Sequence, residues 1–231
     1  TVSDSMLSIA GSDARAFIDA IVDRESSTVD GQLRWENLRW PLPGDEMRVN
    51  SETGDIRVSG SIDEWQVDGL IAVGTEEMPD GTFVVDVAGT RETVTGRIIE
   101  GRVFGGNAAG EVTYSWSGEQ PWSASLNILN IDLGSIFPEL PGRVSGRIDG
   151  HGAIQPFALH AELDNIDGSI QGVELQANGA VDVVDGIFEA RGVRIEHGES
   201  WLMLDGSPTT ETGLAFAAHV ADANSYVEDI A

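Results

Sequence analysis

The sequence contains no cysteine and no lysine, and it has no apolar run long enough to cross a membrane. The absence of cysteine excludes a disulfide framework and a thiolate metal site. A membrane-spanning helix needs about 18 or more apolar residues in succession, so we expect none here. No signal peptide is visible and the first residue is Thr1, so we expect this to be a segment of a longer protein.

Positive charge is scarce. The chain has 39 acidic residues against 13 arginines, which gives a formal net charge of −26. Such a surface repels the phosphates of nucleic acids and anionic membrane surfaces. We therefore expect no nucleic-acid partner, and we expect the acidic residues to form a solvated outer surface.

Motifs for catalysis and metal binding are also missing. The four histidines have neither the i, i+4 spacing of a helical zinc site nor an HExxH motif. There is no GxSxG nucleophile elbow, and the glycine-rich stretch 101–110 lacks the lysine of a phosphate-binding loop. Residues 164–168 resemble a calcium loop only faintly, and a turn between strands is the better interpretation. We expect no enzyme activity, no cofactor and no metal.

Apolar residues alternate with polar ones along most of the chain. Examples are Leu33 and Trp35, and Val181 and Val183, and the stretches begin about 10 to 14 residues apart. Asp-Gly pairs, including Asp167-Gly168 and Asp185-Gly186, predict turns at several junctions. Because strict alternation is typical of a strand with one wet face and one apolar face, the pattern predicts a long antiparallel sheet.

Internal repeats are present. Residues 57–63 match residues 143–149 at six of seven positions, and residues 13–21 resemble residues 222–230. Repeats of this kind indicate a tandem architecture. The predicted organisation is a helical linker and strand end over 1–30, a first β-repeat over 31–130, a second over 131–221, and the start of another linker helix over 222–231.

The N-terminal linker has helical spacing. Ser12 and Asp13 are good N-cap residues, and five apolar residues follow on one helical face. They are Ala14, Phe17, Ile18, Ile21 and Val22. The pattern predicts a short helix that ends near Arg24 and docks across the open end of the sheet, since a helix this short is marginal alone.

A long meander with one apolar face must curl, so that this face meets itself or an apolar ligand. Glycines inside the strands, such as Gly60 and Gly146, would allow sharp bending. The predicted fold is all-β: a curved, taco-like antiparallel sheet of tandem repeats with short linker helices. A closed sheet core would give the same alternation. As a groove, the apolar face would be lined by Val58, Ile62, Val67, Ile71, Val73, Phe83, Val85, Val87, Val112, Tyr114, Leu126, Ile128, Val144, Ile148, Phe157, Leu159, Leu163, Leu175, Val183, Phe188, Leu204 and Phe216.

Several segments resemble the periplasmic TamB proteins. The most specific is the tryptophan–proline stretch 31–42, GQLRWENLRWPL. Similar features are residues 57–60 with the downstream Trp65, the Phe-Gly-Gly piece at 104–106, and the FPELPG linker at 137–142. The resemblance extends from about residue 12 to the end of the sequence.

The resemblance implies an internal segment of a TamB or AsmA-like protein, anchored by other parts in the inner membrane of a Gram-negative bacterium and reaching across the periplasm. Its outer-membrane barrel partner would be a TamA-like protein of the translocation and assembly module. The implied function is phospholipid transport in outer-membrane biogenesis, with acyl chains shielded in a hydrophobic groove. Two alternatives remain: a scaffold or chaperone that pairs strands with outer-membrane proteins, and an adhesive or carbohydrate-binding β-repeat that uses its tryptophans.

Overall fold

The structure, a computed structural model, describes residues 2–8, 13–40, 49–75, 81–117, 121–153, 157–208 and 213–221. The chain divides into two compact units, Thr1–Gly118 and Glu119–Ala231. Each unit is described by itself. The repeat boundaries expected from the sequence remain a prediction.

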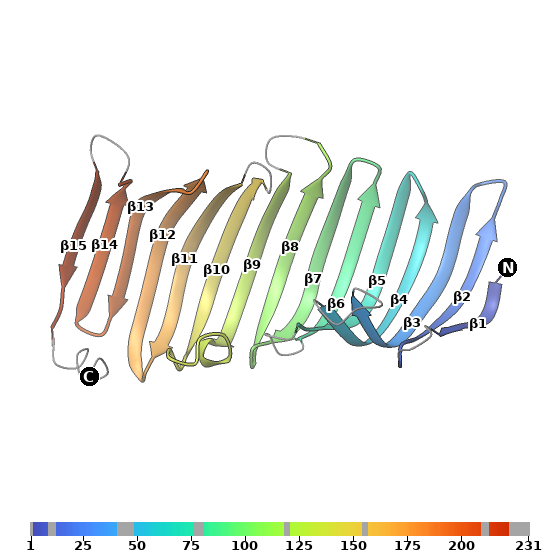
Figure 1. The fold of residues 1–231 in the computed structure, drawn as a ribbon, viewed down its shortest axis with the longest axis horizontal. Helices are drawn as coiled ribbons and strands as arrows, with labels where there is room; N and C mark the ends of the chain where they lie inside the picture. Colours follow the sequence, from blue (N-terminus) through green and yellow to red (C-terminus); the bar gives the residue numbers. More distant parts are fainter. Residues whose placement is uncertain are drawn as a thin grey trace. The chain divides into compact units, whose positions relative to one another are not determined.

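The first unit is a meander of eight antiparallel strands, each paired with its neighbours in the sequence (Figure 1). They are β1 (Val2–Ser8), β2 (Arg15–Asp23), β3 (Thr28–Trp40), β4 (Val49–Ser61), β5 (Glu64–Val73), β6 (Gly81–Thr90), β7 (Thr93–Val103) and β8 (Gly106–Ser115). No pairing joins the first strand to the last within the described residues, so the sheet of this unit is open.

The second unit repeats this plan with seven strands. They are β9 (Trp122–Asp132), β10 (Gly142–Ala153), β11 (Ala158–Ile170), β12 (Val173–Val184), β13 (Ile187–His197), β14 (Ser200–Gly206) and β15 (Leu214–His219). A 3-10 turn, η1 (Leu133–Ser135), follows β9, and Asp132 caps it by accepting a hydrogen bond from the Gly134 amide at 3.0 Å. The open, antiparallel strand arrangement of each unit confirms the all-β, antiparallel fold expected from the alternation.

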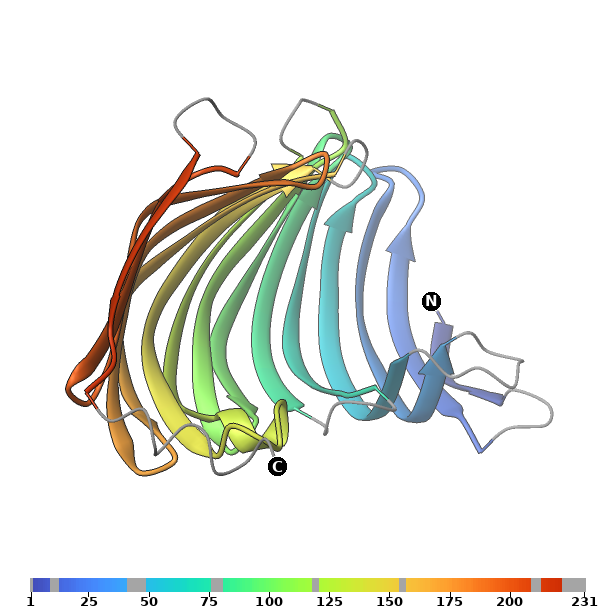
Figure 2. The same cartoon turned by 60° about the vertical axis from the view of Figure 1, so that its left-hand side comes forward.

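The strands of each unit are bowed along their length (Figure 2). In the second unit the register shifts at a bulge in five successive strand pairings, from β9–β10 to β13–β14. In the first unit it shifts in the β1–β2, β6–β7 and β7–β8 pairings. Because a bulge inserts an unpaired residue, it bends the strand and increases its twist. The bulges therefore account for a concave side and a convex side in each unit.

The predicted N-terminal helix is wrong. Residues 15–23 form β2, which pairs with β3 along its whole length and with β1 over residues 15–20. Ile18, Ala20 and Val22 share one side of this strand, whereas Phe17 and Ile21 project from the other, and Ile21 is 61% exposed. Backbone pairing on both sides outweighs a helical pattern of only three turns. The proposed cap at Ser12 and the helix expected at 222–231 lie outside the described residues.

One predicted turn is wrong and another is confirmed. Asp167 and Gly168 lie inside β11, where they pair with β10 and β12. Instead of a turn, this part of β11 contains a bulge, in which Asn165 adopts a φ of 48°. The turn itself follows at Gln171 and Gly172. Asp185 and Gly186 form the tight turn between β12 and β13, as predicted.

The repeat match holds only in part. Gly60 in β4 and Gly146 in β10 both have positive φ, of 115° and 149°. After this glycine the two copies diverge. Ile148 continues in β10, whereas Ile62 lies in the β4–β5 turn, although the alternation had placed it in a strand.

Candidate functional site

Strand register separates two faces in each unit. Residues directly opposite each other in an antiparallel pair project from the same side of the sheet. In the first unit Val67 of β5 lies opposite Val58 of the neighbouring strand β4 and opposite Val87 of the neighbouring strand β6, so the three valines share one face. One residue along the same strand, Asp68 lies opposite Arg57 and Asp86, on the reverse side. We call these sides the apolar face and the polar face.

The second unit has the same two faces. Ile148 lies opposite Leu126 and Leu163 on the apolar face. The neighbouring Asp149 lies opposite Ser125 and Glu162 on the polar face. The alternation continues to the last strand pair, where Leu204 lies opposite Phe216.

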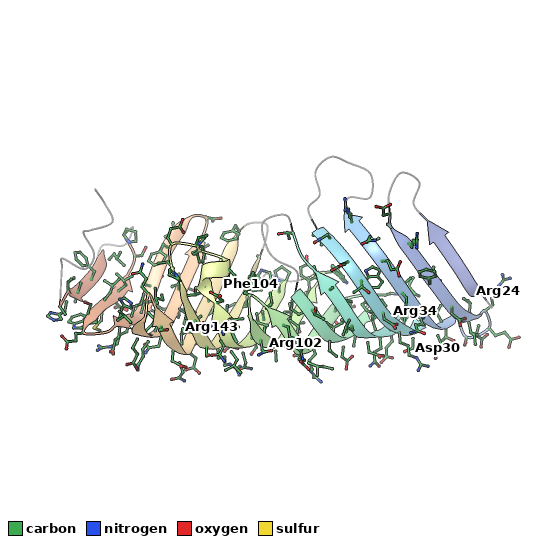
Figure 3. The ribbon with its side chains drawn as sticks, turned by 90° about the horizontal axis from the view of Figure 1, so that it is seen from below. Arg24, Asp30, Arg34, Arg102, Phe104 and Arg143 are labelled. Carbon is green, nitrogen blue, oxygen red and sulfur yellow. The ribbon has the colours of Figure 1, made fainter. Side chains whose placement is uncertain are left out.

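The polar face is the convex one in each unit. The ends of the strands bend toward one side of the sheet. Asp30 and Arg102 project from the opposite, convex side, while Phe104, in the β7–β8 turn, lies on the side toward which the strands bend (Figure 3). The apolar face is therefore concave. It consists of half-buried aliphatic and aromatic side chains over a floor of glycines.

The predicted lining residues lie on this apolar face, with two exceptions. Ile62 is in the β4–β5 turn and 73% exposed, and Phe157 is in the turn before β11 and 53% exposed. The register places the others on the apolar face of one unit or the other: Val58, Val67, Ile71, Val73, Phe83, Val85, Val87, Val112, Tyr114, Leu126, Ile128, Val144, Ile148, Leu159, Leu163, Leu175, Val183, Phe188, Leu204 and Phe216. That they line a lipid groove is a proposal, taken up below.

Aromatic rings on the apolar face cover glycines of the neighbouring strand. Trp35 lies opposite Gly54, and Trp65 lies opposite Gly89. A Cβ placed on either glycine would overlap the facing indole ring, so the rings rest on the backbone where only glycine leaves room. The rings therefore cover the floor of the concave face.

One of these rings is also held by a hydrogen bond. The Trp35 Nε1–H donates to Ser51 Oγ at 2.7 Å, and the buried Ser51 hydroxyl donates in turn to the carbonyl oxygen of Ala72 at 2.6 Å. The carbohydrate-binding alternative would use exposed tryptophans. Trp35, Trp65 and Trp122 are half-buried, and Trp116 is the exposed one among those whose side chains are described.

Among the described residues of each unit, no second layer covers the apolar face. The buried apolar residues are mostly alanines, joined by Ile131, Val144 and Val193. The chain exposes 15199 Å², whereas a compact globular protein of 24.6 kDa exposes about 10,000 Å². The closed core that the sequence left open as an alternative is therefore not what the described residues form. The apolar face is open.

Charged side chains form pairs on the polar face, some between neighbouring strands and some within one strand. Arg57 lies 3.0 Å from Asp30, and Arg147 lies 2.6 Å from Asp149. Hydrogen bonds from Arg147 and then from Ser125 hold the pKa of Asp149 below its ordinary value. These pairs are substantially exposed, so each contributes little to stability.

A histidine cluster on the polar face of the second unit escaped the sequence analysis. His151 and His160 lie opposite each other on β10 and β11, with ring centroids 4.5 Å apart. Asp182 lies 2.7 Å from His160 Nδ1, within hydrogen-bonding distance, and forms an ion pair with Arg191 at 2.6 Å. Nothing in the spacing of 9 residues signals the pair, because the β10–β11 register creates it. No group of three or more potential metal ligands occurs among the described residues.

Comparisons with known proteins give one match. Neither the curated proteins nor the solved structures include a match to this chain. In the part of the chain that the structure describes, no helix has the length and apolar character needed to span a membrane. The family described as "TamB, N-terminal domain" matches residues 14–231, which is nearly the whole sequence, and the chain belongs to the TamB family.

Proposed function

We propose that the apolar face is a groove that shields phospholipid acyl chains from water between the inner and outer membranes. The observation that supports this is a concave apolar face that continues from strand to strand within each unit and has no covering layer. Exposed apolar surface of this extent is typical of a binding surface for an apolar ligand. A groove for acyl chains requires continuity and no catalytic group.

Family membership supports the setting. It suggests a role in outer-membrane assembly, a periplasmic protein anchored in the inner membrane, and association with a TamA-like outer-membrane partner. The TamB family is a structural and transport component rather than a family of enzymes. Phospholipid transport by this chain is the finer step that we propose.

The energetics favour a conduit over a tight-binding site. Burying a chain of about 16 carbons gains on the order of 12 kcal/mol at about 0.8 kcal/mol per CH₂. The same lipid loses a similar amount when its chain leaves the bilayer. The two terms nearly cancel, so an acyl chain passes from bilayer to groove with little net change in free energy.

Native mass spectrometry with lipid extraction tests this proposal. The chain is expressed in a bacterial periplasm and purified, and bound lipid is measured for two variants of adjacent valines in β6. Val85→Arg places a charge on the apolar face, opposite Gly69 and Ile98. Val84→Arg places the same charge on the polar face, opposite Leu70 and Glu100.

We expect lipid on the unmodified chain and on Val84→Arg, and loss of most of it from Val85→Arg. Circular dichroism establishes that both variants keep their strand content. Lipid-free protein in a well-folded sample would overturn the proposal, and so would equal lipid on the two variants. Either result would favour the scaffold described next.

A second function, strand pairing with outer-membrane proteins, is favoured by β15. Its residues Leu214–His219 include no Asp, Glu, Arg or Pro, and among the described residues β15 pairs with β14 alone. Edge strands without charges or proline are templates for another strand. Hydrogen exchange at the β15 amides that slows when a barrel-strand peptide is added would support this role, and unchanged exchange would count against it.

A further inference from the structure

Among the described residues, no acidic or arginine side chain that could form an ion pair with a lipid headgroup is assigned to the apolar face. In both units, the residues that strand register assigns to this face include no Asp, Glu or Arg. Residues 37–40 of β3 and 49–53 of β4 are left unassigned, because the alternation breaks at Asn37, which has a φ of 53°. The only histidine assigned to it is His197, at the end of β13, and its Nε2 is 3.0 Å from the carbonyl oxygen of Ile170. The charged strand residues that the register assigns all lie on the polar face.

A lipid headgroup therefore has no ion-pair partner among the described residues of the groove. A phosphate or ammonium group drawn down between valines and leucines would lose its water and gain no ion pair, and an unpaired charge is strongly disfavoured there. If acyl chains occupy the groove, the headgroup stays in water on its open side. This step rests on the proposed function, because it describes the same site.

The headgroup still lies within the electrostatic field of the polar face. The second unit has 18 acidic and four basic residues, and its strand carboxylates project from the opposite side of a single sheet. Unpaired charges act through water over a Debye length, about 30 Å at 0.01 M salt and about 8 Å at 0.15 M. An excess of 14 negative charges at roughly 20 Å disfavours one added negative charge by on the order of tenfold at 0.01 M salt. At 0.15 M the same repulsion falls to about twofold or less.

We propose that this groove selects lipids by their acyl chain and is indifferent to headgroup structure, and that it disfavours anionic lipids only through screened, long-range repulsion. Two zwitterionic lipids with the same chain bind equally well. An anionic lipid with that chain binds more weakly at low salt and equally well at high salt.

The experiment uses lysophospholipids with one brominated acyl chain, kept below the concentration at which they form micelles. Bromine quenches nearby indoles, and Trp35, Trp65 and Trp122 lie on the apolar face. Quenching titrations give the Kd of the choline, ethanolamine and glycerol lysophospholipids at 0.01 M and 0.5 M salt. A trimethylammonium amphiphile with the same chain reverses the sign of the charge.

We expect the choline and ethanolamine forms to agree within about twofold at both salt concentrations. The glycerol form should bind on the order of tenfold more weakly at 0.01 M salt, the trimethylammonium amphiphile more tightly, and both differences should vanish at 0.5 M. A control chain that keeps Trp201 and has phenylalanine at the other tryptophans should show little quenching, because Trp201 projects from the polar face.

Three results would overturn the inference. A choline-to-ethanolamine ratio above about tenfold at 0.5 M salt would show direct headgroup contact, since the field is screened there. Two further results would show that the negative charge of the glycerol form contacts a charged group of the protein directly. One is tighter binding of the glycerol form than of the choline form, and the other is weaker binding that persists at 0.5 M salt. If none of the lipids quenches the apolar-face tryptophans, both the proposed function and this inference fail. If lipids bind but with a different selectivity, only this inference fails.

Discussion

Replacing Gly89 with alanine should destabilise the first unit through one identifiable contact. The Trp65 ring covers Gly89 on the apolar face. A Cβ at Gly89 would lie 2.8 Å from Cη2 of the ring and closer still to Cζ2 and Cε2, where ordinary contacts begin at 3.4 Å. The ring must therefore lift from the floor or the strands must separate.

The size of the effect follows from this overlap. Overpacking in a well-fitted site costs typically about 1–3 kcal/mol. If Trp65 is first replaced by valine, the overlap is gone, and alanine should then be neutral or stabilise by about 0.4–1 kcal/mol by restricting the unfolded chain. The double-mutant cycle should thus give a coupling energy of about 2 kcal/mol between positions 65 and 89.

Urea unfolding followed by circular dichroism measures all four corners of the cycle. Gly96→Ala is the matched control on the same face, because its Cβ would meet Val87 Cγ2 at 3.8 Å and the Val112 carbonyl oxygen at 3.9 Å, which are ordinary contacts. It should be neutral or slightly stabilising. Equal effects of Gly89→Ala and Gly96→Ala, or additivity with Trp65→Val, would refute the view that the ring rests on Gly89.

Two further predictions concern polar contacts. Ser51→Ala removes the acceptor of Trp35 Nε1 and the donor to the Ala72 carbonyl, so it should lower the free energy of unfolding by about 1–3 kcal/mol in urea titrations. Ser59→Ala, on the polar face of the same strand, should change it little. Asp149→Asn should lower stability by less than about 1 kcal/mol near neutral pH, because the ion pair with Arg147 is exposed. Since the pKa of Asp149 is lowered in the folded state, this contribution exists above the ordinary value of 3.8 and is lost as the pH falls through the folded value. An effect of Asp149→Asn that grew on acidification would contradict this sign.

Much of the fold could be predicted because a period of two is a strong signal. The alternation of Val67, Gly69 and Ile71 fixes a strand, and the same residues face one side in the structure. The helix prediction at residues 14–22 failed for a related reason. A short apolar stretch fits more than one period, and the choice is made by partners that lie elsewhere in the chain. In β2 those partners are β1 and β3.

The site was predicted in its residue types but not in its details. Register decides which residues meet, and bulges shift the register at positions that the sequence marks weakly. The sequence around the bulge at Asn165 predicts a turn, because Asp-Asn and Asp-Gly pairs favour turns. In the structure β11 continues through the bulge to Ile170. The pairing of His151 with His160 depends on the same register and has no counterpart in any short motif.

Alternation alone could not separate a groove from a closed core, because both bury one face of each strand. The difference lies in what covers that face, and domains ordinarily gain their stability from two packed layers. The described parts of each unit supply no second layer, and valines and leucines of the apolar face are left half-exposed. The backbone ladders and the rings set over glycines hold a single sheet together without it. On the proposed function the acyl chain supplies the missing layer. The same exposed face that makes the empty sheet costly in water is then the source of its affinity for lipid.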